Sequence, residues 1–376
     1  MHQRSLTAID LFCGAGGLSE GLRQAGFDVR AGSDFNEAAG ATFERTHGNA
    51  NFLGGPIQGL TVNDFLSASK LRVGELDVLT GGPPCQAYSV YNHKRGMNDA
   101  RSTLFREYLR IVEGLMPRWV VMENVTGITS AGNGAALRAI VEGFTSLGYR
   151  IEWRVLRAEE YGVPQERRRF VFMGNRTGEP IVWPEPTHGT ELGLKPLITV
   201  YDAISDLPIL HNGEAAVGHN YASDARTEYQ VELREGSTGV FNHSAPRLAS
   251  INMQRMKYIS QGGSWRDVPV ELLPRGMRAA RRCDHTKRYG RLHWDRQSST
   301  ILTKCDIHWG AYIHPEQDRS LTVREAARFQ SFPDWFVFEG SQTEQFVQVG
   351  NAVPPVLGRQ LGLALLSGSE GVRKAA

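Results

Sequence analysis

The feature that most constrains the fold is an alternation of short apolar runs and helical patterns through residues 6–175. Strand-like runs occupy 6–12, 27–35, 75–82, 119–125, 151–156 and 170–174. Apolar residues at helical spacing fill 18–25, 36–48, 104–115 and 135–147, and Pro117 stops the third of these helices. This β–α order predicts an α/β fold with a parallel sheet wrapped by helices.

The pattern breaks near residue 178, and the chain to about residue 315 is irregular and rich in Pro, Gly, His and Arg. Helical periodicity returns in 321–332 and again after the prolines of 349–366. We therefore expect an α/β body formed by 1–180 and 316–376, interrupted by an inserted domain at 181–315. A chain of 376 residues with 41% hydrophobic residues can build such a core.

Bulk properties exclude several classes of protein. The net charge of +2 indicates no particular partner, so any nucleic-acid signal must be local. The four cysteines are scattered without metal-type spacing, so we expect neither a metal site nor disulfides, and reduced thiols fit a cytosol. The N-terminus lacks the apolar core of a signal peptide, and the chain lacks an apolar run of about 18 residues, so we expect no membrane association.

The stretch DLFCGAGGLSEGL (10–22) reads as strand, glycine turn and helix, a place where backbone N–H groups can meet an anion. Gly14 and Gly16 fit a dinucleotide fingerprint, but Ser19 occupies its third glycine position. A nucleotide-like ligand and a purely structural turn remain equally open from this loop alone. Asp34 ends the second strand, where an acid can bind a ribose, with Phe35 beside the base; the alternative is that Asp34 caps the next helix.

Two chemically distinctive residues follow predicted strands. Cys85 ends the turn GGPPC, whose prolines fix the direction of the thiol, and Glu123 ends the apolar run WVVM. Strand ends in a doubly wound sheet meet in one crevice, so both side chains can face one site. The alternatives are an inert buried thiol and a structural salt bridge.

Three consecutive arginines in VPQERRRFVF (163–172) precede another buried strand. Strand alternation places Arg167 and Arg169 on one face and Arg168 on the other, unless the run is simply a solvated charge cluster. A thiolate can add to an electron-poor ring, a carboxyl group can hydrogen-bond a ring nitrogen, and arginines can hold a phosphate or the acid.

Together these motifs resemble the DNA cytosine-5 methyltransferases, especially the single-chain bacterial enzymes of restriction–modification systems. The matching segments are DLFCGAGG, GGPPCQAYS, ENV, QERRRF, RSLTVREAARFQSFP (319–333) and GNAVPP (350–355), in the order of the family. They cover about 8–175 and 318–360, and only the insert lacks a match. The resemblance implies a Rossmann-like S-adenosylmethionine-dependent methyltransferase sheet with an irregular target-recognition domain at 181–315.

The resemblance also implies roles for individual residues. The catalytic set is Cys85, Glu123, Arg167 and Arg169. S-adenosylmethionine would be bound by Phe12, Gly14, Ala15, Gly16, Gly17, Leu18, Asp34, Phe35, Ile57, Asn351 and Ala352. The target cytosine and DNA would be bound by Pro84, Gln86, Ser89 and Arg95. Pro56 departs from the family pattern, because an acidic residue commonly stands there to face the adenine amine.

The implied activity is methyl transfer to C5 of cytosine within a short duplex DNA sequence, through a covalent Cys–C6 adduct on a flipped-out base. The basic segment 274–294, which also holds Tyr289, His293 and Trp294, suits contacts with phosphates and base edges. We expect a monomer without metal, acting in the bacterial cytosol or nucleoid and paired functionally with a restriction endonuclease.

Three other classes of protein share parts of this motif pattern. A tRNA cytosine-5 methyltransferase would share the catalytic parts, but the Cys-Phe-Thr element usual in that branch is missing from the insert. A catalytically dead DNA-binding module is disfavoured because Cys85, Glu123 and the arginine motif are intact. A nicotinamide-dependent dehydrogenase is disfavoured by Ser19.

Overall fold

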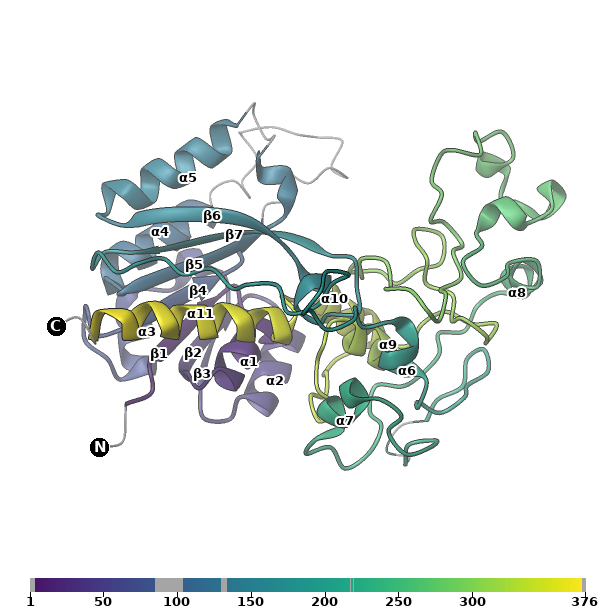
Figure 1. The fold of residues 1–376 in the computed structure, drawn as a ribbon, viewed down its shortest axis with the longest axis horizontal. Coiled ribbons are helices and arrows are strands. Elements are labelled where there is room, and N and C mark those ends of the chain that lie inside the picture. The colour runs from purple at the N-terminus through teal and green to yellow at the C-terminus, as the bar shows by residue number, and fades with distance from the viewer. Residues whose placement is uncertain (1–3, 85–103, 130–133, 217, 219, 374–376) are drawn as a thin grey trace. The chain divides into compact units, whose positions relative to one another are not determined.

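The computed structural model describes residues 4–84, 104–129, 134–216, 218 and 220–373. The chain forms two compact units (Figure 1). Unit 1 consists of Met1–Tyr161, Arg168–Pro186 and Ala352–Ala376, and unit 2 consists of Gly162–Arg167 and Thr187–Asn351.

Unit 1 is built on a seven-stranded sheet with the order β3-β2-β1-β4-β5-β7-β6. The strands are β1 (Thr7–Leu11), β2 (Asp28–Asp34), β3 (Asn51–Gly54), β4 (Val78–Gly81), β5 (Trp119–Asn124), β6 (Arg150–Arg157) and β7 (Arg168–Asn175). The α/β fold class and the strands expected from the sequence are confirmed, with ends shifted by a few residues.

The expectation of a parallel sheet is correct for β1 to β5 and wrong for both pairings of β7. Strand β7 runs antiparallel to both β5 and β6. Residues 158–167 join β6 to β7 with only the 3-10 turn η5 (Ala158–Tyr161) between them. A parallel pair needs a crossover of a dozen or more residues, usually a helix, so this short connection forces the antiparallel arrangement.

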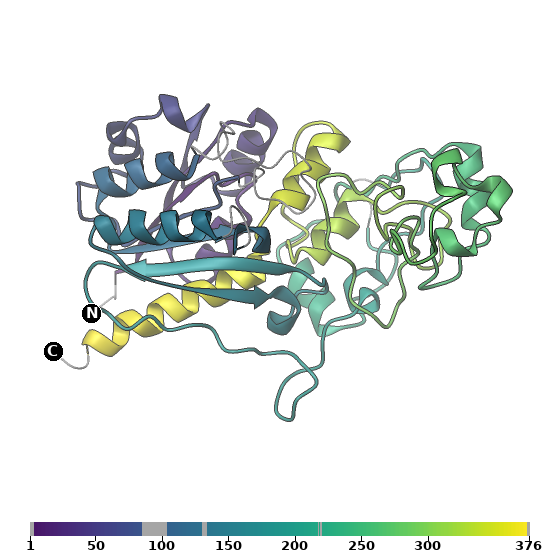
Figure 2. The same ribbon diagram turned by 90° about the horizontal axis from the view of Figure 1, so that it is seen from above.

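Helices cover both faces of this sheet (Figure 2). One face carries α3 (Val62–Ser69), α4 (Leu104–Leu115) and α5 (Ala135–Ser146), whose apolar residues share a buried core with β1, β4 and β5. The other face carries α1 (Gly17–Gln24) and α11 (Pro355–Arg373), while α2 (Glu37–Thr46) packs on β2 and β3. A Cβ at Gly21 would lie 2.4 Å from the carbonyl oxygen of Pro355, so only glycine allows α1 and α11 to approach this closely.

Unit 2 has short helices separated by long irregular segments. They are α6 (Val200–Ile204), α7 (Glu228–Arg234), α8 (Ser250–Met256), α9 (Val323–Phe329) and α10 (Gln342–Asn351). The 3-10 turns are η6 (Trp265–Asp267), η7 (Val270–Leu272) and η8 (Arg275–Met277) here, and η1 (Ile57–Gly59) and η4 (Thr126–Thr129) in unit 1.

The compact units do not follow the expected domain boundaries, because residues 316–351 fall in unit 2. Helix α9 packs on α6 and α10. Arg328 of α9 is fully buried between two carboxylates, at 2.5 Å from Asp206 and 2.6 Å from Asp334. This division concerns compactness alone, so the assignment of 181–315 to DNA recognition remains a prediction.

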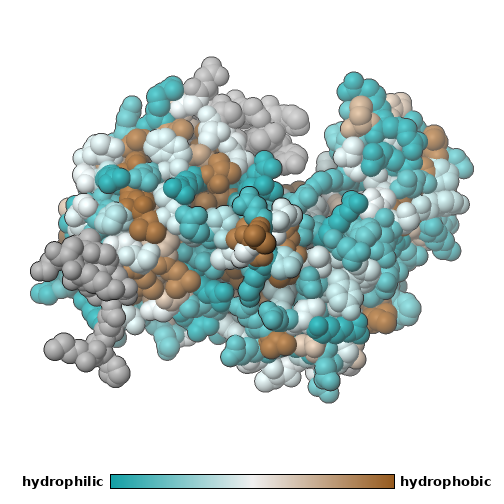
Figure 3. All heavy atoms as spheres, viewed as in Figure 1, coloured by the Kyte–Doolittle hydropathy of each residue, from teal (hydrophilic) through white to brown (hydrophobic). Residues whose placement is uncertain are grey.

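On the face shown in Figure 3, hydrophobic residues form small groups set among hydrophilic ones. Within the described ranges, no helix combines the length and the apolar character needed to cross a membrane. The same residues contain no cluster of three or more His, Cys, Asp or Glu side chains arranged to hold a metal ion.

Candidate active site

The glycine loop lies between β1 and α1 in unit 1. Its backbone has positive φ angles at Phe12 (55°), Gly14 (54°) and Gly16 (93°), a left-handed conformation that glycine adopts without steric cost. The N–H of Gly16 donates to the carbonyl of Cys13 at 2.9 Å, which closes the turn. The N–H of Cys13 donates to the carbonyl of Ser33 at 3.0 Å, so the loop is also tied to the end of β2.

The two glycines of the loop have different surroundings. A Cβ at Gly16 would lie 2.6 Å from Cε1 of His47 and 2.9 Å from Cδ2 of Phe43, so no side chain fits there. A Cβ at Gly14 would meet no atom within 4 Å. The loop therefore packs tightly against His47 and Phe43 at Gly16, whereas its backbone at Gly14 has space for a ligand to approach.

Asp34 fastens this loop to the end of β2. Its Oδ2 accepts a hydrogen bond from the N–H of Gly14, and its Oδ1 accepts one from the N–H of Asn36, both at 2.9 Å. Burial raises the pKa of Asp34, while these two amide hydrogen bonds oppose the rise. The N-cap of α2 is Asn36, whose Oδ1 accepts from the N–H of Ala39, so Asp34 is not the cap of that helix.

The remaining predicted cofactor residues divide by location. In unit 1, Ala15, Gly17, Leu18 and Ile57 are buried, Phe12 and Ala352 are half-buried, and Phe35 exposes 68% of its surface directly after β2. Asn351 ends α10 and belongs to unit 2. The structure brings Phe12 to Leu18 and Asp34 to one end of the sheet, where an exposed ring beside a carboxylate suits a nucleoside.

Asp10 is a buried carboxyl group that the sequence reasoning did not select. It lies on β1, where its Oδ2 accepts from Ser19 Oγ at 2.7 Å and its Oδ1 from Thr80 Oγ1 at 2.9 Å. Burial raises the pKa of Asp10 from 3.8 to about 6, although both hydroxyl donors oppose the shift. The only sequence signal was its position, an acid inside an otherwise apolar strand just before the glycine loop.

Glu123 of β5 forms an ion pair with Arg169 of the neighbouring strand β7. The guanidinium Nε lies 2.5 Å from Oε1 of Glu123, and the two side chains are 13% and 11% exposed respectively. Burial lowers the pKa of Arg169, and the Glu123 charge opposes that change. The carboxylate is thus held in one orientation by a nearly dehydrated cation.

The proline turn that leads to Cys85 is fixed beside Glu123. A Cβ at Gly82 would lie 3.1 Å from Oε2 of Glu123. The side-chain amide of Asn124 donates to the carbonyl of Pro83 at 3.1 Å. Asn124 was quoted in the ENV motif but given no role, and this contact shows that it anchors the turn.

Four predicted site residues, Cys85, Gln86, Ser89 and Arg95, lie outside the described residues. Pro84, the last described residue before them, is half-buried.

The motif QERRRF has partners in both units. Whereas Arg169 pairs with Glu123 in unit 1, Arg167 is 1% exposed and donates to the carbonyls of Ile301 at 3.1 Å and Gly350 at 3.0 Å within unit 2. Gln165 accepts from the N–H of Ile301 at 2.8 Å. Arg167 also donates to Oε1 of Gln165 at 3.4 Å, and its assignment as a catalytic residue remains a prediction.

The basic segment 274–294 divides into buried and exposed parts. Arg291 is 6% exposed and is held by the carbonyls of Met256, Ile259 and His314. Tyr289 is 1% exposed. These two side chains build the interior of unit 2, which corrects the expectation that the whole cluster is available to DNA. The exposed cations of the segment are Arg275, Arg278, Arg281, Arg282 and Lys287.

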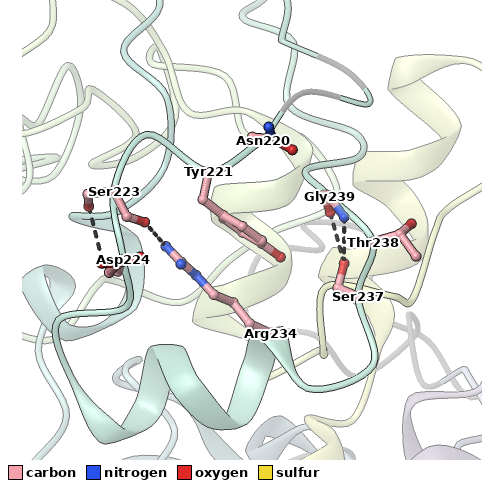
Figure 4. A pocket seen from close by; sticks show the side chains of 8 residues that line it. All are labelled: Asn220, Tyr221, Ser223, Asp224, Arg234, Ser237, Thr238 and Gly239. Atoms are coloured by element: carbon pink, nitrogen blue, oxygen red, sulfur yellow. Dashed lines mark hydrogen bonds between the residues drawn. The ribbon is translucent and has the colours of Figure 1, made fainter.

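Unit 2 also contains a polar pocket of about 550 Å³ (Figure 4). The guanidinium of Arg234 lies 3.7 Å from the ring centroid of Tyr221 and donates to the carbonyl of Ser223 at 2.9 Å. The Tyr221 hydroxyl donates to Asp334 at 2.7 Å. Because internal partners hold these groups, and none of the described site residues lines the pocket, it forms no part of the candidate site.

The sheet, the glycine turn after its first strand and the acid after its second define the class: the fold is that of S-adenosylmethionine-dependent methyltransferases. A prophage-encoded DNA modification methyltransferase from E. coli shares this fold with a TM-score of 0.75 at 24% identity, covering 97% of this chain and all of that one. An Entamoeba histolytica methyltransferase shares it with a TM-score of 0.59 at 15% identity, covering 97% and 99%.

Sequence comparison then identifies the family. Residues 6–367 match the C-5 cytosine-specific DNA methylases. Type II methyltransferase M.AgeI of Thalassovita gelatinovora is 36% identical, with 95% of this chain and 98% of the relative covered. Type II methyltransferase M1.HphI of Haemophilus parahaemolyticus is 35% identical, with 96% and 87% covered. The chain belongs to the C-5 cytosine-specific DNA methylase family and is a DNA cytosine-5 methyltransferase, as its motifs predicted.

Proposed function

We propose that this enzyme methylates C5 of a cytosine within one short duplex DNA sequence, as part of a Type II restriction–modification system. The observation that supports this most directly is the Glu123–Arg169 pair beside the proline turn that leads to Cys85. The relatives are named as Type II methyltransferases, which supports the restriction–modification context. Methylation would protect DNA from a cognate endonuclease in the bacterial cytosol or nucleoid.

The proposed chemistry divides between the thiol and the acid. The Cys85 thiolate adds to C6 of cytosine, so a sulfur–carbon bond forms and the ring's electron pair shifts toward C5 and N3. The Glu123 carboxyl group, carrying a proton, donates a hydrogen bond to N3 and accepts one from the exocyclic amine, which stabilises that charge. After methylation, a base from solvent, such as hydroxide, removes the proton on C5. The electron pair of that C–H bond reforms the C5–C6 double bond, and the bond between C6 and sulfur breaks with its electrons returning to the Cys85 thiolate.

The positions of the supporting residues fit these roles. Arg169 fixes the Glu123 carboxylate, and Asn124 fixes the turn from which the chain continues to Cys85. We assign Pro84, Gln86, Ser89 and Arg95 to the cytosine and its DNA strand. A cytosine inside a duplex is inaccessible to a thiol, so the base must leave the stack before Cys85 can reach C6.

The residues of unit 1 fit S-adenosylmethionine as the methyl donor. Gly14 faces open space, Asp34 presents a carboxylate that a ribose can approach, and Phe35 offers an exposed ring for the adenine. Bound S-adenosylmethionine supplies an electrophilic methyl carbon. Gly14 to Leu18 would orient it, while Ile57 and Ala352 would complete its site within unit 1, and the role expected for Asn351 remains a prediction from the sequence. We propose no metal, and a monomer as the active form.

The decisive experiment is transfer of a labelled methyl group to mixed-sequence duplex DNA and, in parallel, to tRNA, with the product mapped base by base. We expect 5-methylcytosine at one short duplex sequence and none in tRNA. Cys85→Ala should abolish transfer while S-adenosylmethionine still binds with near-normal affinity. Label confined to tRNA, or substantial turnover by the variant, would contradict the proposal.

A further inference from the structure

Trp309 is an unusually exposed aromatic side chain in unit 2. It exposes 60% of its surface, although an indole ring is among the largest apolar groups a protein can bury. Its neighbours on either side along the chain, Ile307 and Tyr312, are 0% and 1% exposed. The buried residues fix the backbone on both sides of Trp309, while its ring stays accessible to a ligand.

The loop that presents Trp309 is held in place by backbone contacts. The N–H of Tyr289 donates to the carbonyl of Ile307 at 2.6 Å, and the N–H of Leu292 donates to that of Ile313 at 3.0 Å. Arg291 and Ile313 form a parallel β-bridge. Residues 289–292 therefore run beside 307–313, which places the Trp309 loop next to the basic segment.

Arg288 from the basic segment lies over the Trp309 ring, with its guanidinium carbon 4.9 Å from the ring centroid. A cation on one face of an indole is favourable and restrains both side chains. Exposed cations precede Arg288 along the chain at Arg281, Arg282 and Lys287. Asp284 pairs with Arg281, Glu166 with Lys287 and Asp306 with His308, whereas Arg282 and Arg288 form no ion pair with a described carboxylate. The net character of this surface is thus aromatic and cationic.

We infer that Trp309 and Arg288 form a DNA-contacting pair, in which the indole packs against a base or sugar of the recognised sequence while Arg288 contacts the strand. Cations contact the phosphates of a duplex, and an aromatic ring can pack against a deoxyribose or an apolar base edge, so this combination suits a DNA contact. The inference rests on the proposed function and adds two residues that contact the duplex.

The first test compares Trp309→Ala, Trp309→Phe and the matched control Trp153→Ala. Trp153 is also an exposed tryptophan, at 43%, but lies on β6 of unit 1. Loss of a base-contacting ring should weaken binding of the cognate duplex by roughly 5- to 150-fold. The Phe variant should lose less, and the control should bind DNA normally. All three should keep wild-type affinity for S-adenosylmethionine and wild-type thermal unfolding.

A second test separates ring packing from charge. Arg288→Gln should lower the slope of log affinity against log salt concentration by about 1, because it removes one phosphate-neutralising cation. Trp309→Ala should leave that slope unchanged. Duplex DNA should quench part of the wild-type tryptophan fluorescence, and this part should be missing in Trp309→Phe.

The inference is overturned if Trp309→Ala binds and methylates its cognate sequence within twofold of wild type. It is equally overturned if the variant keeps this DNA activity but loses binding to a protein partner. If wild type methylates duplex DNA normally while the variant matches it, only this inference fails. If wild type neither binds nor methylates duplex DNA, the proposed function and this inference fail together.

Discussion

Arg169→Gln removes the cation that holds the Glu123 carboxylate, so it should lower both stability and turnover. The pair spans 2.5 Å, and its side chains are only 13% and 11% exposed. Removing one member leaves the other charge almost dehydrated, which costs about 3–5 kcal/mol of unfolding free energy. Glu123→Gln should cost a similar amount, because it leaves the Arg169 guanidinium without its carboxylate.

The double variant Glu123→Gln/Arg169→Gln leaves neither charge, so its stability should recover much of the loss. We expect a coupling free energy of about 3 kcal/mol between the two positions. The surface pair Arg30–Asp28 is a matched control in the same sheet. Its guanidinium nitrogen lies 2.7 Å from the carboxylate oxygen, and each side chain is 39% exposed. Its coupling should be about 0.2–1 kcal/mol, since solvent screens both charges.

The assay combines urea unfolding of the four proteins in each cycle with single-turnover methyl transfer. Arg169→Gln should slow transfer by about 100-fold through misplacement of Glu123, with S-adenosylmethionine affinity unchanged. A coupling below about 0.5 kcal/mol for Glu123–Arg169 would show that the pair does not hold the carboxylate. Unchanged single-turnover rates in Arg169→Gln would separately refute its positioning role.

Three further predictions follow from unit 1. Gly16→Ala should weaken S-adenosylmethionine binding at least tenfold, measured by calorimetry, because its Cβ would lie 2.6 Å from His47. The control Gly26→Ala has the same φ of 93° but no atom within 4 Å of its Cβ, so it should bind the cofactor normally. Equal affinities would disprove this account of the loop. Asn124→Ala should slow single-turnover transfer while cofactor affinity stays constant, because it releases the proline turn; an unchanged rate would contradict that anchoring role. The pKa of Asp10 is raised from 3.8 to about 6, so the folded state binds this proton more strongly and stability should fall as pH rises through that window. Wild type should therefore lose about 2 kcal/mol relative to Asp10→Asn between pH 4 and 7 in urea unfolding, and parallel curves would refute the shift.

Most strands and helices of unit 1 could be predicted because their signals are local, whereas β3 and α3 were missed. The β–α alternation gives the body, Pro117 ends α4 after Leu115, and the glycines of the loop adopt the expected positive φ angles. Each of these properties depends on residues a few positions apart. The ordered motifs also sufficed to predict the family, since they carry residue types that the chemistry requires.

The pairings of the candidate site depend on contacts between distant parts of the chain. The sequence predicted that an arginine would hold Glu123, and Arg169 does so. The neighbouring Arg167 instead donates to the carbonyls of Ile301 and Gly350 and to the side chain of Gln165. Arg291 likewise reads as a DNA contact in sequence and is buried in the structure. A side chain's charge is visible in the sequence, whereas its exposure is set by the segments that fold around it.

The sequence alone determined the α/β class, the order of elements and the residue types available for chemistry. Only the tertiary structure decided that β7 and β6 run antiparallel, that Asp10 is tied to Ser19 and Thr80, and that Asn124 grips the proline turn. Periodicity and backbone preference act over one turn or one strand, so a sequence displays them directly. Hydrogen bonds between residues as far apart as Asp10 and Thr80 exist only after the sheet has brought its strands together.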